Sequence, residues 1–150
     1  MRQRLPNLIA ITAVNFFKRN FKVGGFQDTP FKKWKEVKGN KSGRKPLVQS
    51  GNLRRGIKKI KVTQNKIIVG VAGNIPYAQI HNEGGKIPIT PKMRRWAWYM
   101  FKKTNNELYK GIALTSKKHI EIPERKFIGD SVALDKALER LIIKQMKTLE

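Results

Sequence analysis

The sequence predicts an α+β fold in which a small, mostly antiparallel sheet with a β-hairpin packs against N-terminal and C-terminal helices. Apolar residues recur every three to four positions near both ends of the chain, which is typical of amphipathic helices. Between them, short segments alternate apolar and polar residues, and glycine pairs separate these segments. The chain has 150 residues, of which 39% are hydrophobic. This length and composition predict a single globular domain over residues 1–150.

The first predicted element is a helix over residues 5–21. Pro6 suits its first turn, and Gly24-Gly25 ends it. Its apolar stripe comprises Leu5, Leu8, Ile9, Ala13, Phe16 and Phe17. Residues 26–49 are predicted to form a loop, and its part rich in Gly, Asn, Lys and Ser predicts a mobile segment near residues 36–48.

The middle of the chain is predicted to contain the β-hairpin. A short helical turn opens at Ser50 and places Leu53 beside Ile57. In the hairpin that follows, Gln64-Asn65 makes the turn, and the first strand alternates apolar residues with lysines. The apolar positions are Ile60 and Val62 on the first strand and Ile67, Val69 and Val71 on the second.

Short helical and extended segments follow the hairpin. Pro76 begins one helical turn, and Gly84-Gly85 ends it. Three residues of this turn share a face, namely Tyr77, Ile80 and His81. Residues 86–90 and 119–122 are extended segments that we expect to pair as neighbouring strands.

Two longer helices complete the prediction. The first covers residues 91–103 within a helical insertion near residues 91–118. Its buried stripe is predicted to comprise Met93, Trp96, Ala97, Met100 and Phe101. The last helix begins after a cap at Asp130 or Ser131. Its apolar residues are Leu134, Leu138, Leu141, Ile142 and Leu149.

Charge is the unusual feature of the composition. The chain has 33 Lys and Arg residues against 10 Asp and Glu residues, a formal net charge of +23. Such a charge attracts polyanions, but a solvated, lysine-rich surface explains it equally well. The lack of cysteine excludes disulfides, thiol catalysis and sulfur-based zinc sites, and it fits a reducing cytoplasm. No segment approaches the roughly 20 apolar residues that span a bilayer, so we expect no membrane association.

The sequence offers little for catalysis. His81 and Glu83 could share a cation, but a hydrolytic metal site needs about three protein ligands, and the only other histidine is His119. A histidine packed beside Tyr77 is therefore the favoured interpretation. No serine lies in a nucleophile elbow, and no phosphate-binding glycine loop of the required spacing is present. We expect no enzymatic activity, no cofactor and no metal.

One segment mixes cations with aromatic rings, as nucleic-acid-binding surfaces do; it includes Arg94, Arg95, Trp98 and Tyr99. Trp98 and Tyr99 lie off the predicted buried stripe and so need another role. Stacking on bases is one such role. Burial against a neighbouring subunit is favoured about twofold over it, because Trp, Tyr and Arg anchor protein interfaces.

Three segments share a distinctive order of glycines, apolar residues and arginines. They are Leu47 to Ile57 (LVQSGNLRRGI), Val69 to Gly85 with its VGV and PYAQIHNEGG sequences, and Arg125 to Gly129 (RKFIG). In this order, with a helix before and after, they resemble motifs of the phage virion morphogenesis proteins. That family includes the Mu-type and P2-type tail completion proteins, which act in head-tail joining. Two positions depart from its pattern: Gly56 stands in place of the usual Ser, and Glu83 in place of a common aromatic residue.

The resemblance implies a structural protein without enzymatic activity, added late in virion assembly at the tail end or in the neck. It also implies a homo-oligomeric ring, often sixfold, in contact with other tail or neck proteins, and a basic lumen would face the passing DNA. The motif residues expected in tight turns are Gly51, Gly84, Gly85 and Gly129, and those expected in the core are Leu53, Ile57, Tyr77, Ile80 and Phe127, beside His81. Arg54, Arg55 and Arg125 are placed at subunit contacts. The protein would occupy the bacterial host cytoplasm during assembly and the virion afterwards.

Two alternatives stay open on the sequence. A basic nucleic-acid-binding protein without catalysis would bind DNA or RNA with an affinity that falls steeply with salt. A nuclease or toxin using His81 would cleave nucleic acid in the presence of a metal and lose that activity in His81→Ala.

Overall fold

The chain folds into two compact units in the computed structural model, which describes residues 4–37, 43 and 45–147. Unit 1 comprises Met1–Glu83 and Glu124–Glu150, and unit 2 comprises Gly84–Pro123. The predicted α+β class is confirmed. Within the described ranges, the strands form three separate two-stranded antiparallel sheets, where the sequence predicted one sheet.

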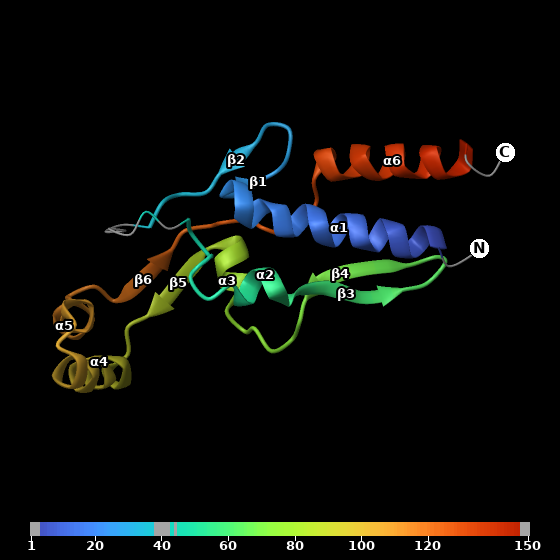
Figure 1. Cartoon of the computed structure of the whole chain (residues 1–150). Coiled ribbons are helices and arrows are strands. Elements are labelled where there is room, and N and C mark those ends of the chain that lie inside the picture. Colours follow the sequence, from blue (N-terminus) through green and yellow to red (C-terminus); the bar gives the residue numbers. More distant parts are fainter. Residues whose placement is uncertain (1–3, 38–42, 44, 148–150) are drawn as a thin grey trace. The chain divides into compact units, whose positions relative to one another are not determined.

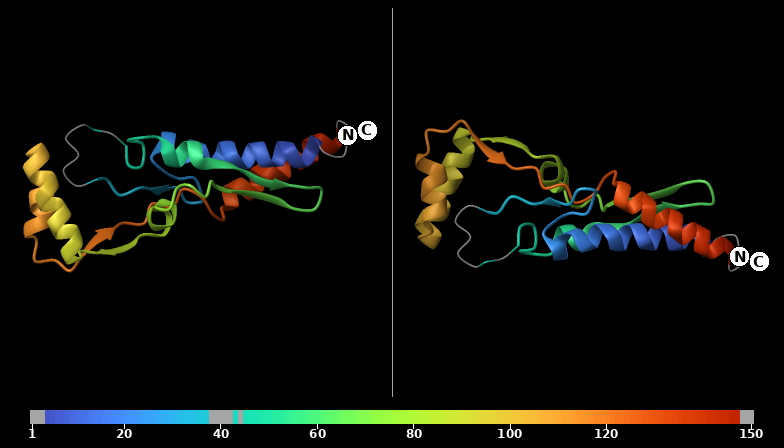
Figure 2. Two further views of the ribbon diagram at one scale, coloured as in Figure 1. Left: turned by 90° about the horizontal axis from the view of Figure 1, so that it is seen from below. Right: turned by 90° about the horizontal axis from the view of Figure 1, so that it is seen from above.

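Unit 1 is built in layers around its first helix. Its helices are α1 (Arg4–Val23), α2 (Asn52–Gly56), α3 (Ala78–Glu83) and α6 (Val132–Lys147), and its strands are β1 (Gly25–Phe26), β2 (Lys32–Lys33), β3 (Ile57–Val62) and β4 (Ile67–Val71). α1 lies between α6 and the β3–β4 hairpin and contacts both (Figure 1). Both views of Figure 2 show α1 running alongside the hairpin. The helix predicted over residues 5–21 is thus confirmed and central, and it ends before Gly24, whose φ is +74°.

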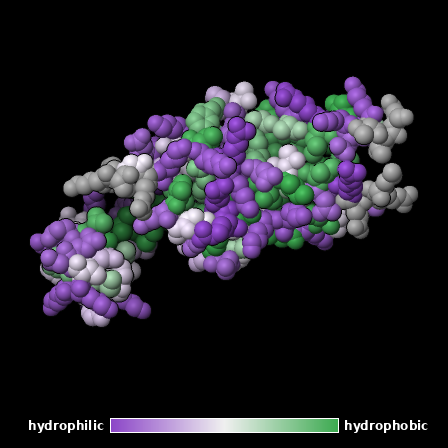
Figure 3. Space-filling model, in the orientation of Figure 1, coloured by the Kyte–Doolittle hydropathy of each residue, from purple (hydrophilic) through white to green (hydrophobic). Residues whose placement is uncertain are grey.

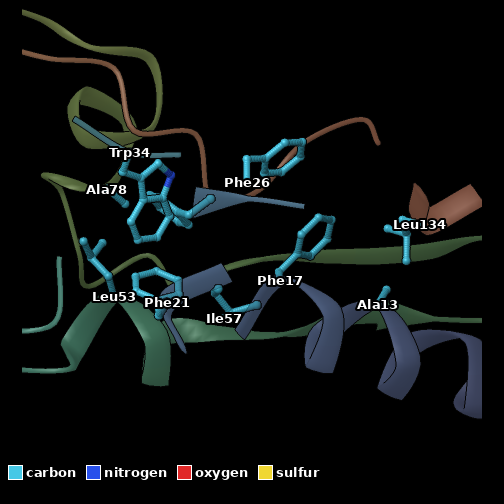
Figure 4. Close-up of a cluster of buried hydrophobic side chains, with 10 residues drawn as sticks. Ala13, Phe17, Phe21, Phe26, Trp34, Leu53, Ile57, Ala78 and Leu134 are labelled. Carbon is cyan, nitrogen blue, oxygen red and sulfur yellow. The ribbon is translucent and has the colours of Figure 1, made fainter. Parts of the chain in front are cut away.

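Aromatic side chains form the centre of the unit 1 core. The ring of Phe21 packs edge-on against Trp34, with ring centroids 5.3 Å apart, and at a tilt against Phe127, with centroids 5.4 Å apart. Phe26 and Phe127 have no exposed surface. Figure 4 shows Phe17, Phe21, Phe26 and Trp34 converging from α1 and the segment after it, with Leu53 and Ile57 beside them. Residues distant in sequence therefore share one apolar cluster.

The β3–β4 hairpin is confirmed with one change. Its turn lies at Gln64-Asn65 and is closed by the Thr63 hydroxyl, which donates to the carbonyl of Lys66 and accepts from its amide, each at 3.0 Å. The register shifts between Lys59 and Lys61, and Ile60 is 55% exposed. The strict alternation predicted for this strand is therefore wrong at Ile60, because a bulge changes which face each later side chain occupies.

The final helix is capped from two directions. The Ser131 hydroxyl accepts a hydrogen bond from the Leu134 amide at 3.2 Å and donates to the Gln27 carbonyl at 2.8 Å. Ser131 is thus the cap among the two predicted candidates. The Asp28 carboxylate, from a distant loop, accepts from the Val132 amide at 3.0 Å. Hydrogen bonds, first of all from the backbone of Thr29, lower the pKa of Asp28.

Unit 2 is a two-stranded ribbon joined to a pair of helices. Its elements are β5 (Gly85–Pro88), α4 (Pro91–Thr104), α5 (Glu107–Leu114) and β6 (His119–Ile122). β5 and β6 pair as neighbours, as predicted, and the pairing is antiparallel, with Gly85 opposite Ile122. Asn105, at φ +52°, ends α4, and the Asn106 side chain caps α5 by accepting from the Leu108 amide. The sequence predicted a helical insertion here, but it did not resolve α5 as a separate helix.

Trp96 corrects the predicted stripe of α4. It is 48% exposed, whereas Ala97 next to it is fully buried. The wide side chain lies at the margin of the α4–α5 contact, with its ring edge-on to Tyr109 at 5.5 Å. Two parts of the prediction fall outside the described residues: Leu149, and positions 38–42 and 44 of the segment expected near residues 36–48.

Asn20 provides a test of how unit 1 is held together. Its side chain has no exposed surface, and it donates to the Phe127 carbonyl at 3.0 Å. We expect Asn20→Ala to lower the free energy of unfolding by about 2 kcal/mol, because a buried carbonyl loses its donor. Urea denaturation followed by circular dichroism measures the change. The matched control is Asn15→Ala on the exposed side of the same helix, and an equal loss in both variants would contradict this role.

Candidate interaction surfaces

The three motif segments meet inside unit 1. The Arg125 amide donates to the His81 carbonyl at 3.0 Å. The Asn82 side-chain oxygen accepts from the amides of Phe127 at 2.9 Å and Ile128 at 3.1 Å. Leu53, from the first segment, packs in the same buried cluster as Phe127. Segments separated by more than forty residues therefore form one interlocked structure, in which α3 holds the 125–129 segment by its backbone.

Sequence reasoning missed the two asparagines that make this arrangement. Asn82 holds two backbone amides, and Asn20 holds the Phe127 carbonyl while its own oxygen accepts from the Gln27 amide at 3.0 Å. Asn20 lies three and four residues after Phe17 and Phe16, where the stripe would place an apolar residue. A polar residue at such a position predicts a buried hydrogen bond, and this pattern could have identified it.

The motif glycines take the backbone conformations expected of turns. Gly51, Gly84 and Gly129 have φ values of +69°, +75° and +139°. Gly56 stands where the motif that the segment resembles has Ser. A Cβ atom at this position would lie 2.3 Å from the Cδ1 atom of Ile75, so the packing of Ile75 leaves no room for a side chain. Gly85 is the first residue of β5.

The apolar motif residues divide into two groups. Leu53, Ile57 and Phe127 are buried, as predicted for core residues. Tyr77 is 40% exposed and Ile80 is only partly buried, so the core role predicted for Tyr77 is wrong. Tyr77 instead lies at the surface, where its ring covers His81.

Arg125 is an internal brace, and its predicted place at a subunit contact is wrong. Its side chain is 7% exposed. The Nε atom donates to the Lys35 carbonyl at 2.9 Å and an Nη atom to the Glu36 carbonyl at 3.5 Å. Both acceptors are backbone carbonyls of the same chain. The guanidinium ties the end of the 32–36 segment to the closing segment of unit 1.

The other arginines of the predicted interface differ in how many hydrogen bonds they make within their own unit. Arg55 donates to the Ser50 carbonyl and to the Asn52 side chain, both at 2.7 Å, and so stiffens the turn before α2. Arg94 turns inward in unit 2, where it donates to the carbonyls of Ala113, Thr115 and Lys117. These contacts make Arg94 a brace between α4 and the end of α5. Arg54 and Arg95 are exposed.

Trp98 and Tyr99 are exposed on α4. Trp98 is 38% exposed and Tyr99 is 61% exposed. The ring of Trp98 packs against that of Phe101, with ring centroids 6.0 Å apart. Arg95, Trp98 and Tyr99 are therefore the predicted interface residues that remain exposed on unit 2. On unit 1, the predicted interface residues Arg54 and Arg55 are both exposed.

His81 packs against Tyr77, as predicted, with ring centroids 5.9 Å apart. Its Nδ1 atom is buried and has no hydrogen-bond partner within the described part of the chain. Burial, and then the nearby charge of Arg125, lower the pKa of His81. Glu83 is exposed and accepts from Gln79 at 3.2 Å. No group of three metal-binding side chains gathers anywhere among the described residues.

Comparison with known proteins adds no relative: no family model, curated protein or solved structure matches this chain. Within residues 4–37, 43 and 45–147, no helix combines the length and apolar character needed to cross a bilayer.

The buried imidazole predicts a pH dependence of stability. Because the folded state lowers the pKa of His81 below its ordinary value of about 6.5, the unfolded chain takes up the proton first as the pH falls. The free energy of unfolding should therefore decrease as the pH drops below about 6.5. Chemical denaturation between about pH 7.5 and 5 measures this slope, and His81→Gln should flatten it. His119→Gln, which leaves His81 in place, should retain the slope; a slope unchanged in His81→Gln would contradict the assignment.

Proposed function

We propose that this chain is a structural, non-enzymatic phage protein that acts in virion assembly at the tail end or neck. The observation that carries the proposal is that the motif residues pack against and hydrogen-bond to one another within unit 1. Leu53, Asn82 and Phe127 join the three family-like segments through packing and backbone hydrogen bonds. Arg125, the charged residue most deeply placed among them, binds carbonyl groups of its own chain. Residues used in this way support a rigid frame for docking.

The surface of unit 1 supports an assembled state. Apolar side chains remain exposed on several of its elements, among them Ile11 on α1, Ile60 on β3, and Ile143 and Met146 on α6. Figure 3 shows hydrophobic residues among the hydrophilic ones over the visible face of this unit. In the proposed assembly, neighbouring subunits would bury these side chains. In a ring, the net charge of +23 would act on the DNA that passes through the lumen.

Gene deletion tests the proposal directly. We expect induced particles that lack the chain to appear by electron microscopy as filled heads and separate tails, because the joining component is missing. Supplying the wild-type chain from a plasmid should restore joined particles and infectivity.

Two variants sharpen this test. His81→Gln should restore joining, since the proposal gives the imidazole no chemical step. Leu53→Asp should fail, because it places a charge in the core of unit 1. Joined, infectious particles formed without the chain would refute the proposal, and so would a His81→Gln chain that folds normally and cannot restore them.

A further inference from the structure

The outer face of α4 carries cations with aromatic rings between and beside them. The helix has five basic residues and no acidic one, and only Arg94 turns inward. At 3.6 residues per turn, the remaining four fall on the side opposite the buried Ala97, and Tyr99 lies among them. These four are Lys92, Arg95, Lys102 and Lys103, and all are exposed. Lys92 and Lys103 are separated by about 16 Å along the helix axis.

Three aromatic rings accompany these cations. Tyr99, Trp98 and Trp96 are 61%, 38% and 48% exposed. Trp96 rests edge-on against Tyr109, and Trp98 against Phe101, so each indole is held in place while much of its surface stays open. Rings that are held in this way lose little conformational freedom when a flat ligand stacks on them.

The charge of unit 2 selects an anionic ligand. Its sequence contains nine Lys and Arg residues against two glutamates. Glu107 already pairs with Lys110 at 3.5 Å on α5, and Glu121 lies 3.6 Å from His119 on β6. No carboxylate on α4 therefore offsets its four outer cations. A second copy of the same face is disfavoured as the occupant, because like charges would meet.

The residue types favour nucleic acid over an acidic protein. Protein interfaces are depleted of lysine, above all at their centres. On α4, three lysines and one arginine share the face of Tyr99 and lie between the two tryptophans. Cations that follow a phosphate backbone, with rings on which bases stack, are the arrangement that binds single strands without sequence preference.

We propose that the outer face of α4 binds single-stranded nucleic acid. Lys92, Arg95, Lys102 and Lys103 contact phosphates, and Tyr99 and the two tryptophans stack on unpaired bases. This site is independent of the virion role proposed above, because it uses unit 2 alone.

Fluorescence anisotropy with a labelled 20-nucleotide oligothymidine and the full chain tests the site. Tyr99→Ala should weaken binding roughly tenfold, through loss of one stacked base. Lys102→Ala/Lys103→Ala should lower the slope of log affinity against log salt by about 1.4, at about 0.7 per phosphate contact on a single strand. The control is Lys58→Ala/Lys59→Ala on β3, which removes the same charge from unit 1 and should leave affinity and slope nearly unchanged. Circular dichroism confirms that each variant is folded.

Competing ligands decide the remaining questions. Duplex DNA of equal length should bind more weakly, since its bases are already stacked. Equal binding of duplex, or equal losses from the α4 and β3 lysine pairs, would overturn the proposal in favour of diffuse charge. Polyglutamate that competes as well as oligothymidine would overturn it in favour of an acidic protein partner. Oligouridine of the same length tests RNA in the same assay. Whichever of oligouridine and oligothymidine binds more tightly supports the site and identifies RNA or DNA as its ligand.

Discussion

Two asparagine side chains hold the backbone of residues 127–128, and the order of unit 1 depends on them. Asn20 reaches this segment from α1 by donating to the Phe127 carbonyl, and Asn82 reaches it from α3 by accepting from two successive amides. Among the described residues, this segment lies outside the three two-stranded sheets, so these side chains supply hydrogen bonds that a neighbouring strand would otherwise provide. With its polar groups satisfied, the segment can place Phe127 in the centre of the core.

The same constraint extends to the ends of unit 1. Gln27, which donates to Asn20, also offers its carbonyl to Ser131, the cap of α6. The Trp34 indole donates to the Lys126 carbonyl at 2.7 Å, and Arg125 binds the carbonyl of Lys35 next to it. The loop after α1 is thus joined to the closing segment by polar contacts on both sides of the aromatic core. Such a frame presents surfaces in fixed positions, which is what docking into a larger particle requires.

Periodicity in the sequence predicted most of the helices and two of the three strand pairs, because apolar spacing reflects which side of each element is buried. It did not predict α5 or the β1–β2 pair. α1, the β3–β4 hairpin, the β5–β6 pair and α6 followed from it. Contacts across the chain could not be predicted in this way: the Arg125 side chain looked available for a partner, and its carbonyl acceptor on Lys35 lies 90 residues away. Trp96 fitted the α4 stripe by spacing, but its side chain is 48% exposed, whereas Ala97 beside it is fully buried. Arg95, Trp98 and Tyr99 were singled out because cations and rings off an apolar stripe are recognisable from local sequence, and all three are exposed.

The two units use their characteristic residues differently. In unit 1 most of the motif residues pack and hydrogen-bond within the unit, whereas in unit 2 aromatic rings and cations of α4 stay exposed. Native-state hydrogen exchange measured by NMR tests most directly whether residues 127–128 belong to the rigid core of unit 1. The Phe127 and Ile128 amides should exchange only through global unfolding, with the same opening free energy as the amide of Phe21 in α1. Fast exchange at residues 127 and 128 while Phe21 stays protected would contradict the account.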